Sequence, residues 1–193
     1  MRLFVAIEIP EYLRDELDRR ARALRGKLPK ARWVRPQGMH LTLSFLGETA
    51  PERLDELHRE LAASCAESEA IGLRLNETGA FPPRGKARVL WAGLAGADGR
   101  PSAALARLHT AVAAAVERAA GVVPDSRPFH PHLTLARCSP PWPREALERF
   151  LGDFGPLPAD AFTVAEGVLF ESELHPEGAR YRVAGTYPLG GRE

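Results

Sequence analysis

The sequence predicts a fold of mixed strands and helices, α/β or α+β, built from two similar halves. Segments with the apolar patterns of strands and of amphipathic helices alternate along the whole chain, which is typical of layered α/β and α+β folds. In addition, a nine-residue motif occurs twice, and its two copies start 92 residues apart, at Arg35 and Arg127. This spacing is too long for a solenoid repeat but suits the two halves of a duplicated fold.

The first half of the chain begins with a strand and a helix. Residues 3–9 are almost continuously apolar, as expected of a strand buried inside a sheet. Between residues 11 and 25, leucines and an alanine recur at helical spacing among charged residues, which predicts an amphipathic helix. Thr49 is followed three residues later by Glu52, the pattern of a capping box, and we expect Thr49 to cap a second helix that extends to about residue 65.

The second half contains strands and helices in a similar succession. The patterns predict strands at 71–75, 88–94, 162–170 and 181–187, and helices at 102–120 and 144–151. Clusters of proline and glycine at 81–85 and 139–143 indicate loops, and neither is long enough to link independent domains. We therefore expect one domain over residues 1–193, with the basic residues at 84–88 in a solvated loop.

Composition and charge exclude several classes of protein. Of the 193 residues, 26 are Lys or Arg and 25 are Asp or Glu, so the formal charge of +1 provides no global field for binding long nucleic acid. Cys65 and Cys138 are too few for a disulfide framework, which favours a reducing compartment. The first residues match neither a signal peptide nor a membrane span, so we expect a cytoplasmic protein without membrane contact.

The repeated motif, RPxxxHLTL, places an imidazole and a hydroxyl together in each half. Residues i and i+2 of a strand point to the same side, so His40 shares a face with Thr42 while the neighbouring leucines point to the other face. His132 and Thr134 have the same relationship in the second copy. If the symmetry of the fold lays the two strands side by side, two imidazoles and two hydroxyls converge on one site.

This group of side chains suits phosphodiester hydrolysis. The attacking water must lose a proton and the leaving oxygen must gain one, and histidine is the side chain whose ordinary pKa best fits both tasks. Threonine hydroxyls can donate to the charged phosphoryl oxygens. We expect no cofactor and no metal. His130 and His132 are possible metal ligands, which leaves a metal-dependent phosphodiesterase as an alternative, but the sequence offers no third ligand.

The motifs also resemble those of the two-histidine phosphoesterase superfamily and, within it, of the RNA 2',3'-cyclic phosphodiesterases, also called 2'-5' RNA ligases. Both HxTx motifs of that superfamily are intact, and the similarity covers nearly the whole chain, in the segments 2–10, 32–48, 79–94, 127–137 and 168–183. The resemblance implies an α+β fold of two pseudo-symmetric lobes, each with an antiparallel or mixed sheet and flanking helices, around a central cleft. It further implies metal-independent opening of 2',3'-cyclic phosphates to 2'-phosphates.

The same resemblance implies roles for individual residues. His40 would be the proton donor to the leaving 3'-oxygen, and His132 the proton acceptor that activates water. Phosphate contacts would come from Thr42, Thr134 and Arg137, and Phe45 would stack on a base.

Two of these residues conflict with simple strand alternation. Arg137 lies five residues from His132 and should face the opposite side, so that a bulge, a strong twist or the end of the strand is needed to bring it to the site. Phe45, at the equivalent position of the first copy, could equally be a core aromatic on the leucine face.

The expected partners are RNA ends or nucleotides that carry a 2',3'-cyclic phosphate, and we expect a monomer. Two other functions are also compatible with the sequence. One is a 2'-5' RNA ligase, which uses the same two histidines in the reverse reaction. The other is a noncatalytic module that binds a nucleotide or an RNA end.

Overall fold

The strands of this protein form a single antiparallel sheet. The computed structural model describes residues 1–173, 175 and 179–190, so that part of the 168–183 segment lies outside the described residues. Within them the sheet has nine strands: eight follow the order β7-β4-β5-β6-β3-β1-β8-β9, and the ninth, β2, pairs with β6. The strands are β1 (Arg2–Glu8), β2 (Arg32–Trp33), β3 (His40–Glu48), β4 (Ile71–Phe81), β5 (Ala87–Gly96), β6 (His132–Trp142), β7 (Phe162–Val164), β8 (Glu166–Glu173) and β9 (Arg180–Pro188).

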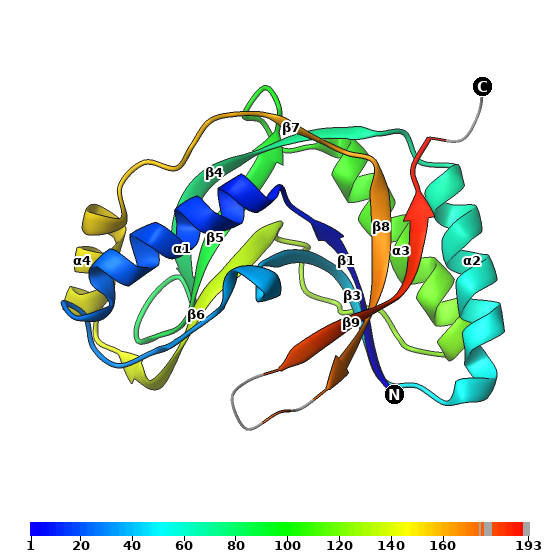
Figure 1. The fold of residues 1–193 in the computed structure, drawn as a ribbon, viewed down its shortest axis with the longest axis horizontal. Coiled ribbons are helices and arrows are strands. Elements are labelled where there is room, and N and C mark those ends of the chain that lie inside the picture. Colours follow the sequence, from blue (N-terminus) through cyan, green and yellow to red (C-terminus); the bar gives the residue numbers. More distant parts are fainter. Residues whose placement is uncertain (174, 176–178, 191–193) are drawn as a thin grey trace.

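The helices gather in two pairs, one at each end of the sheet (Figure 1). They are α1 (Glu11–Arg25), α2 (Leu54–Ala66), α3 (Ala103–Ala120) and α4 (Arg144–Phe154), with two short 3-10 helices, η1 (Pro36–Gly38) and η2 (Pro51–Arg53). α1 packs with α4 near β4, and α2 packs with α3 near β3 and β9. No helix of the described residues combines the length and apolarity needed to cross a bilayer.

The prediction of an α+β fold with two similar halves is confirmed. β7-β4-β5-β6 mirrors β9-β8-β1-β3 about the centre of the sheet, so each strand has a counterpart in the other half. The two half-sheets are not separate, because β3 and β6 pair at Leu41 and Leu133. The strands that carry the repeated motif therefore form the junction of the halves.

Most sequence-predicted elements occur where expected. The helix at 11–25 has those bounds, and Ser102 caps α3 by accepting a hydrogen bond from the Leu105 amide at 3.1 Å. The 162–170 segment differs, since it forms two strands, β7 paired with β4 and β8 paired with β1. The chain passes here from one half of the sheet to the other. The basic residues at 84–88 lie mostly exposed in and beside the turn between β4 and β5, as predicted.

The prediction that Thr49 caps the second helix is wrong. The Thr49 hydroxyl donates to the carbonyl of Gly47 at 3.4 Å, and its amide donates to Met1 at 2.8 Å. The threonine is thus held at the end of the sheet, and α2 begins five residues later, at Leu54, with no side-chain cap. The tertiary hydrogen bonds of the backbone override the local capping pattern.

The core lies between the sheet and the helices. It contains the motif leucines, Leu41, Leu43, Leu133 and Leu135, which are all buried. A second, smaller apolar cluster consists of Phe4, Ala6, Val168 and Phe170. Phe4 stacks on His40, at 4.7 Å between ring centroids. This cluster therefore lies beside a motif histidine, on the face of the sheet that points away from the core.

Candidate functional site

The two copies of the repeated motif meet at the centre of the sheet. Leu41 of β3 and Leu133 of β6 are directly opposite each other in an antiparallel pair, and both are buried. Continued by one residue in each direction, this register sets His40 opposite Thr134 and Thr42 opposite His132. These four side chains are half-buried, in alternation with the buried leucines, so they share the face away from the core.

The register also fixes how the histidines lie relative to each other. His40 and His132 are diagonal neighbours across the junction, and such pairs in an antiparallel ladder lie roughly 7–8 Å apart. That separation applies to the Cα atoms, and imidazoles carried by such a pair can reach a phosphate group placed between them. The structure thus brings together the two histidines and two threonines that the sequence singled out.

A β-bulge in each motif strand changes the alternation beyond the threonines. On β3, Thr42 and Ser44 face consecutive residues of β1, so Leu43 is the extra residue. On β6, Thr134 and Ala136 likewise face consecutive residues of β5, and Leu135 is the extra residue. A bulge of this kind shifts the facing of all residues that follow it.

The bulge on β6 returns Arg137 to the face of the histidines. Leu135 and Ala136 are both buried, and Arg137 is exposed. Its positive charge also reaches His132, whose pKa it helps to lower. Of the three possibilities that the sequence left open for Arg137, the bulge is the one found.

The corresponding bulge on β3 exposes Phe45. Its side chain is 66% exposed, so the alternative of a core aromatic is wrong. The ring lies 5.9 Å from that of Phe4, which in turn stacks on His40. Phe45 therefore extends an aromatic surface that begins at the His40 imidazole.

His132 is oriented by the backbone beside it. Its Nδ1 lies 2.7 Å from the carbonyl oxygen of His130. A carbonyl only accepts hydrogen bonds, so Nδ1 carries the proton, and in the neutral ring Nε2 is a free acceptor. Burial lowers the pKa of His132, as do the charges of His130 and Arg137, while the bond to the carbonyl raises it.

His40 lies in an aromatic environment. Its ring stacks on Phe4 and meets the edge of Tyr181, with centroids 5.2 Å apart. Burial lowers its pKa to about 4, so the imidazole is neutral at pH 7. Glu8 is directly opposite His40 on β1, but its carboxylate is directed to Arg14, at 3.6 Å.

Comparison with known proteins identifies the family. The family model described as 2'-5' RNA ligase superfamily matches residues 13–175. The chain belongs to this superfamily. Among curated relatives, the RNA 2',3'-cyclic phosphodiesterase of Thermus thermophilus is 36% identical over 99% of this chain and 91% of its own. Proteins of the same name from Methanothermobacter thermautotrophicus and Geobacillus stearothermophilus are 26% and 30% identical; the chain covers 95% of the former and 57% of the latter.

Solved structures of similar proteins have the same fold. TT0787 of Thermus thermophilus superposes with a TM-score of 0.82, at 32% identity and full coverage of both chains. Escherichia coli LigT in its apo form gives a TM-score of 0.73, at 26% identity, with 98% of this chain and 97% of LigT covered. LigT has also been solved in complex with 3'-AMP.

Sequence reasoning missed part of the surroundings of His132. No sequence pattern placed Trp91 beside this histidine, yet its ring lies 4.6 Å from His130 and 6.4 Å from His132. It covers Gly79, its partner on β4, where a Cβ atom would stand 2.2 Å from the indole Cζ2. A glycine within a strand close to a tryptophan was the available signal. Trp33 and Trp142, in contrast, pack against each other in the core.

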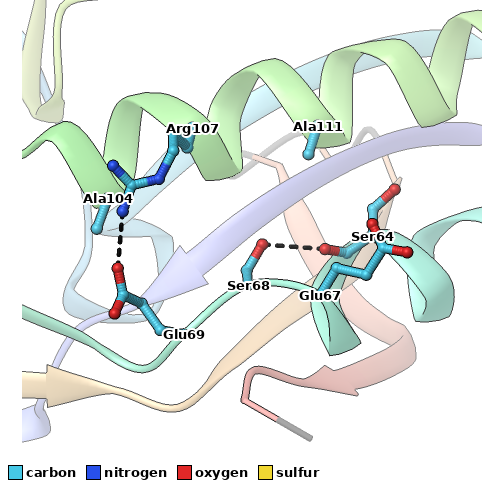
Figure 2. A pocket seen from close by; sticks show the side chains of 7 residues that line it. All are labelled: Ser64, Glu67, Ser68, Glu69, Ala104, Arg107 and Ala111. Carbon is cyan, nitrogen blue, oxygen red and sulfur yellow. Dashed lines mark hydrogen bonds and ion pairs between the residues drawn. The ribbon is translucent and has the colours of Figure 1, made fainter. Parts of the chain in front are cut away.

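Other features of this superfamily member lie away from the motif strands. Among the described residues, no three His, Cys, Asp or Glu side chains are grouped to hold a metal ion. A hollow of about 400 Å³ is lined by the end of α2, the turn after it and α3, where Arg107 pairs with Glu69 at 2.7 Å (Figure 2). None of its lining residues belongs to the motif strands, so it is separate from the histidine site.

Proposed function

We propose that this protein hydrolyses 2',3'-cyclic phosphates at RNA ends and leaves a 2'-phosphate, by paired histidine acid–base catalysis without a metal ion. The observation that carries the proposal is the pairing of Leu41 with Leu133, because it joins the His-Thr pairs of both halves on one face. The names of the curated relatives, RNA 2',3'-cyclic phosphodiesterase, support the same substrate class.

In this mechanism His132 accepts a proton from the attacking water. The water oxygen bonds to phosphorus as the bond to the 3'-oxygen breaks, and His40 gives a proton to that oxygen. The hydrogen bond from Nδ1 of His132 to His130 supports this direction, because it leaves Nε2 unprotonated and able to accept. A second turnover requires a proton to return from His132 to His40 through solvent.

His40 must be protonated to act as the donor. Its pKa of about 4 in the free protein keeps it neutral at pH 7, so the negative charge of a bound phosphodiester has to raise that pKa. In this mechanism, substrate binding and protonation of His40 are therefore coupled.

The remaining site residues position the substrate. Thr42 and Thr134 donate to the non-bridging oxygens, whose charge Arg137 balances from the end of the same face. Phe45 offers an exposed ring for the base of the terminal nucleotide. The noncatalytic binding module is disfavoured, because simple binding does not call for two imidazoles with depressed pKa values.

Residues 1–193 are proposed to act as one domain, as a monomer and in the cytoplasm. β1 belongs to one half while α1, which follows it, packs with α4 in the other half, so neither half is a contiguous folding unit. Both halves of the site come from one chain, which suits a monomer. Cys65 and Cys138 are buried free thiols, which suits a reducing compartment such as the cytoplasm. A molar mass from light scattering that exceeds that of one chain would contradict the monomer.

The deciding experiment is a product assay on a short RNA with a 2',3'-cyclic end, in the presence of a chelator. We expect full conversion to the 2'-phosphate. A 3'-phosphate product would refute the role given to His40 at the 3'-oxygen, and loss of activity with the chelator would favour a metal-dependent enzyme. Joining of two RNA ends at equal enzyme concentration would favour the ligase.

A further inference from the structure

Arg32 and Arg137 face each other across two neighbouring strands. They are directly opposite in the antiparallel pair of β2 and β6, so their side chains lie on the same face. Both are exposed, and neither has a carboxylate partner among the residues that the structure describes. Like charges directly opposite each other destabilise a sheet. An anion bound between the two guanidinium groups would offset this repulsion.

Arg32 points to the face on which the histidines lie. The next residue, Trp33, packs into the core, with its ring 6.4 Å from those of Trp142 and Phe150. Because successive residues of a strand point to opposite sides, Arg32 projects away from the core. The bulge at Leu135 brings Arg137 to the same side.

The arginine pair lies beside the histidine site along β6. This strand pairs with β3 at Leu133 and, on the same edge, with β2 at Ala136 and Arg137. The Val34 amide donates to the carbonyl of Leu135 at 2.9 Å and fixes β2 between these points. Beyond the point where β3 separates from β6, β2 therefore takes the place beside β6 at the edge of the site.

The other half of the site has no such charge at the equivalent position. Arg137 corresponds to Phe45, and its partner Val89 on β5 corresponds to Phe4 on β1. One end of the site is therefore aromatic and the other cationic. A nucleotide chain with a base at the first end would direct its next phosphate toward the second.

Resting on the function proposed above, we propose that Arg32 binds the phosphodiester that joins the cyclic-ended nucleotide to the nucleotide before it, beside Arg137, which balances the charge of the reacting phosphate. The preferred substrate is then an oligonucleotide of two or more residues, and a cyclic mononucleotide lacks one anchoring group. Arg32 is thus assigned as a substrate-binding residue that does not touch the reacting phosphate.

The test compares a cyclic-ended trinucleotide with the matching cyclic mononucleotide in wild-type protein, Arg32→Ala, Arg32→Lys and the control Arg35→Ala. Arg35 is an exposed arginine three residues away, outside the β2–β6 pair. We expect Arg32→Ala to lower kcat/KM for the trinucleotide about tenfold, mainly through KM, and to change that for the mononucleotide less than about twofold. Arg32→Lys should recover part of the loss, and Arg35→Ala should resemble wild type.

Salt dependence gives a second readout. The slope of log kcat/KM for the trinucleotide against log salt should decrease by about one in Arg32→Ala, as for loss of one phosphate contact. Equal losses on both substrates, an unchanged trinucleotide rate or an unchanged slope would each overturn the role of Arg32 while leaving the hydrolase intact. Wild-type protein that turns over neither substrate would instead refute the proposed function. Thermal unfolding of each variant shows whether the fold is retained.

Discussion

Leu43 and Leu135 occupy equivalent positions in the two motif strands, and each is the extra residue of a β-bulge. The internal symmetry of the chain therefore extends beyond the sequence motif to an irregularity of the backbone. Each bulge brings the residue two places later, Phe45 or Arg137, onto the face of the histidines. The same device presents an aromatic ring in one half and a cation in the other.

Removal of either histidine should abolish most of the activity. We expect His40→Ala and His132→Ala each to lower kcat at least about a hundredfold on a cyclic-ended RNA, because each removes one proton transfer. Circular dichroism should show the wild-type fold for both. His58→Ala, in α2, is the control and should keep wild-type turnover. Activity that survives both site substitutions would end the acid–base proposal.

The roles of acid and base can be separated with a second substrate. A 4-nitrophenyl ester of a nucleoside phosphate has a leaving group that needs no proton. His40→Ala should then lose less than about tenfold on this ester, while His132→Ala should lose about as much as on the cyclic phosphate. The opposite pattern in single-turnover kinetics would exchange the two assignments.

The pH dependence should be bell-shaped with an optimum on the acidic side. Burial lowers the pKa of both imidazoles below the ordinary value of 6.5, to about 4 for His40. Both are neutral at pH 7, so kcat/KM should rise as the pH falls and one ring becomes protonated. Once the pH is low enough for both rings to be charged, no base remains, and the rate should fall. A flat profile of kcat/KM between pH 5 and 8 would contradict this prediction.

Phe45 should contribute to substrate binding rather than to stability. Its ring is exposed, so Phe45→Ala should leave the free energy of unfolding within about 0.5 kcal/mol of wild type. Loss of a base stack, about 1–3 kcal/mol, should raise KM at least about fivefold with little change in kcat. Tyr12→Ala, at a comparably exposed aromatic on α1, serves as the matched control and should alter neither constant.

Gly79 should be required for the position of Trp91. A methyl group at Gly79 would stand 2.2 Å from the indole, so Gly79→Ala should displace the ring and cost about 1–3 kcal/mol of unfolding free energy. The matched control is Gly26→Ala, where nothing lies within 4 Å of the added carbon and stability should stay within about 1 kcal/mol. Urea denaturation measures both, and equal stabilities would show that the ring has room to move.

The sequence alone predicted the properties that depend on neighbours along the chain. The phase of His40 with Thr42 and of His132 with Thr134 follows from the alternation of side chains in a strand, and the duplication of the motif indicated two related halves. Helix α1 and the helix predicted at 102–120, observed as α3, likewise follow from local patterns.

Only the tertiary structure decided which strands pair and where their alternation breaks. The contact of Leu41 with Leu133 joins residues 92 positions apart, and no periodicity in either strand specifies it. The bulges that turn Phe45 and Arg137 outward arise from the fit of each motif strand to its neighbour, so strict alternation misplaced both residues. The opposition of Arg32 and Arg137 has the same origin, because cross-strand register is set by the assembled sheet and not by either segment alone.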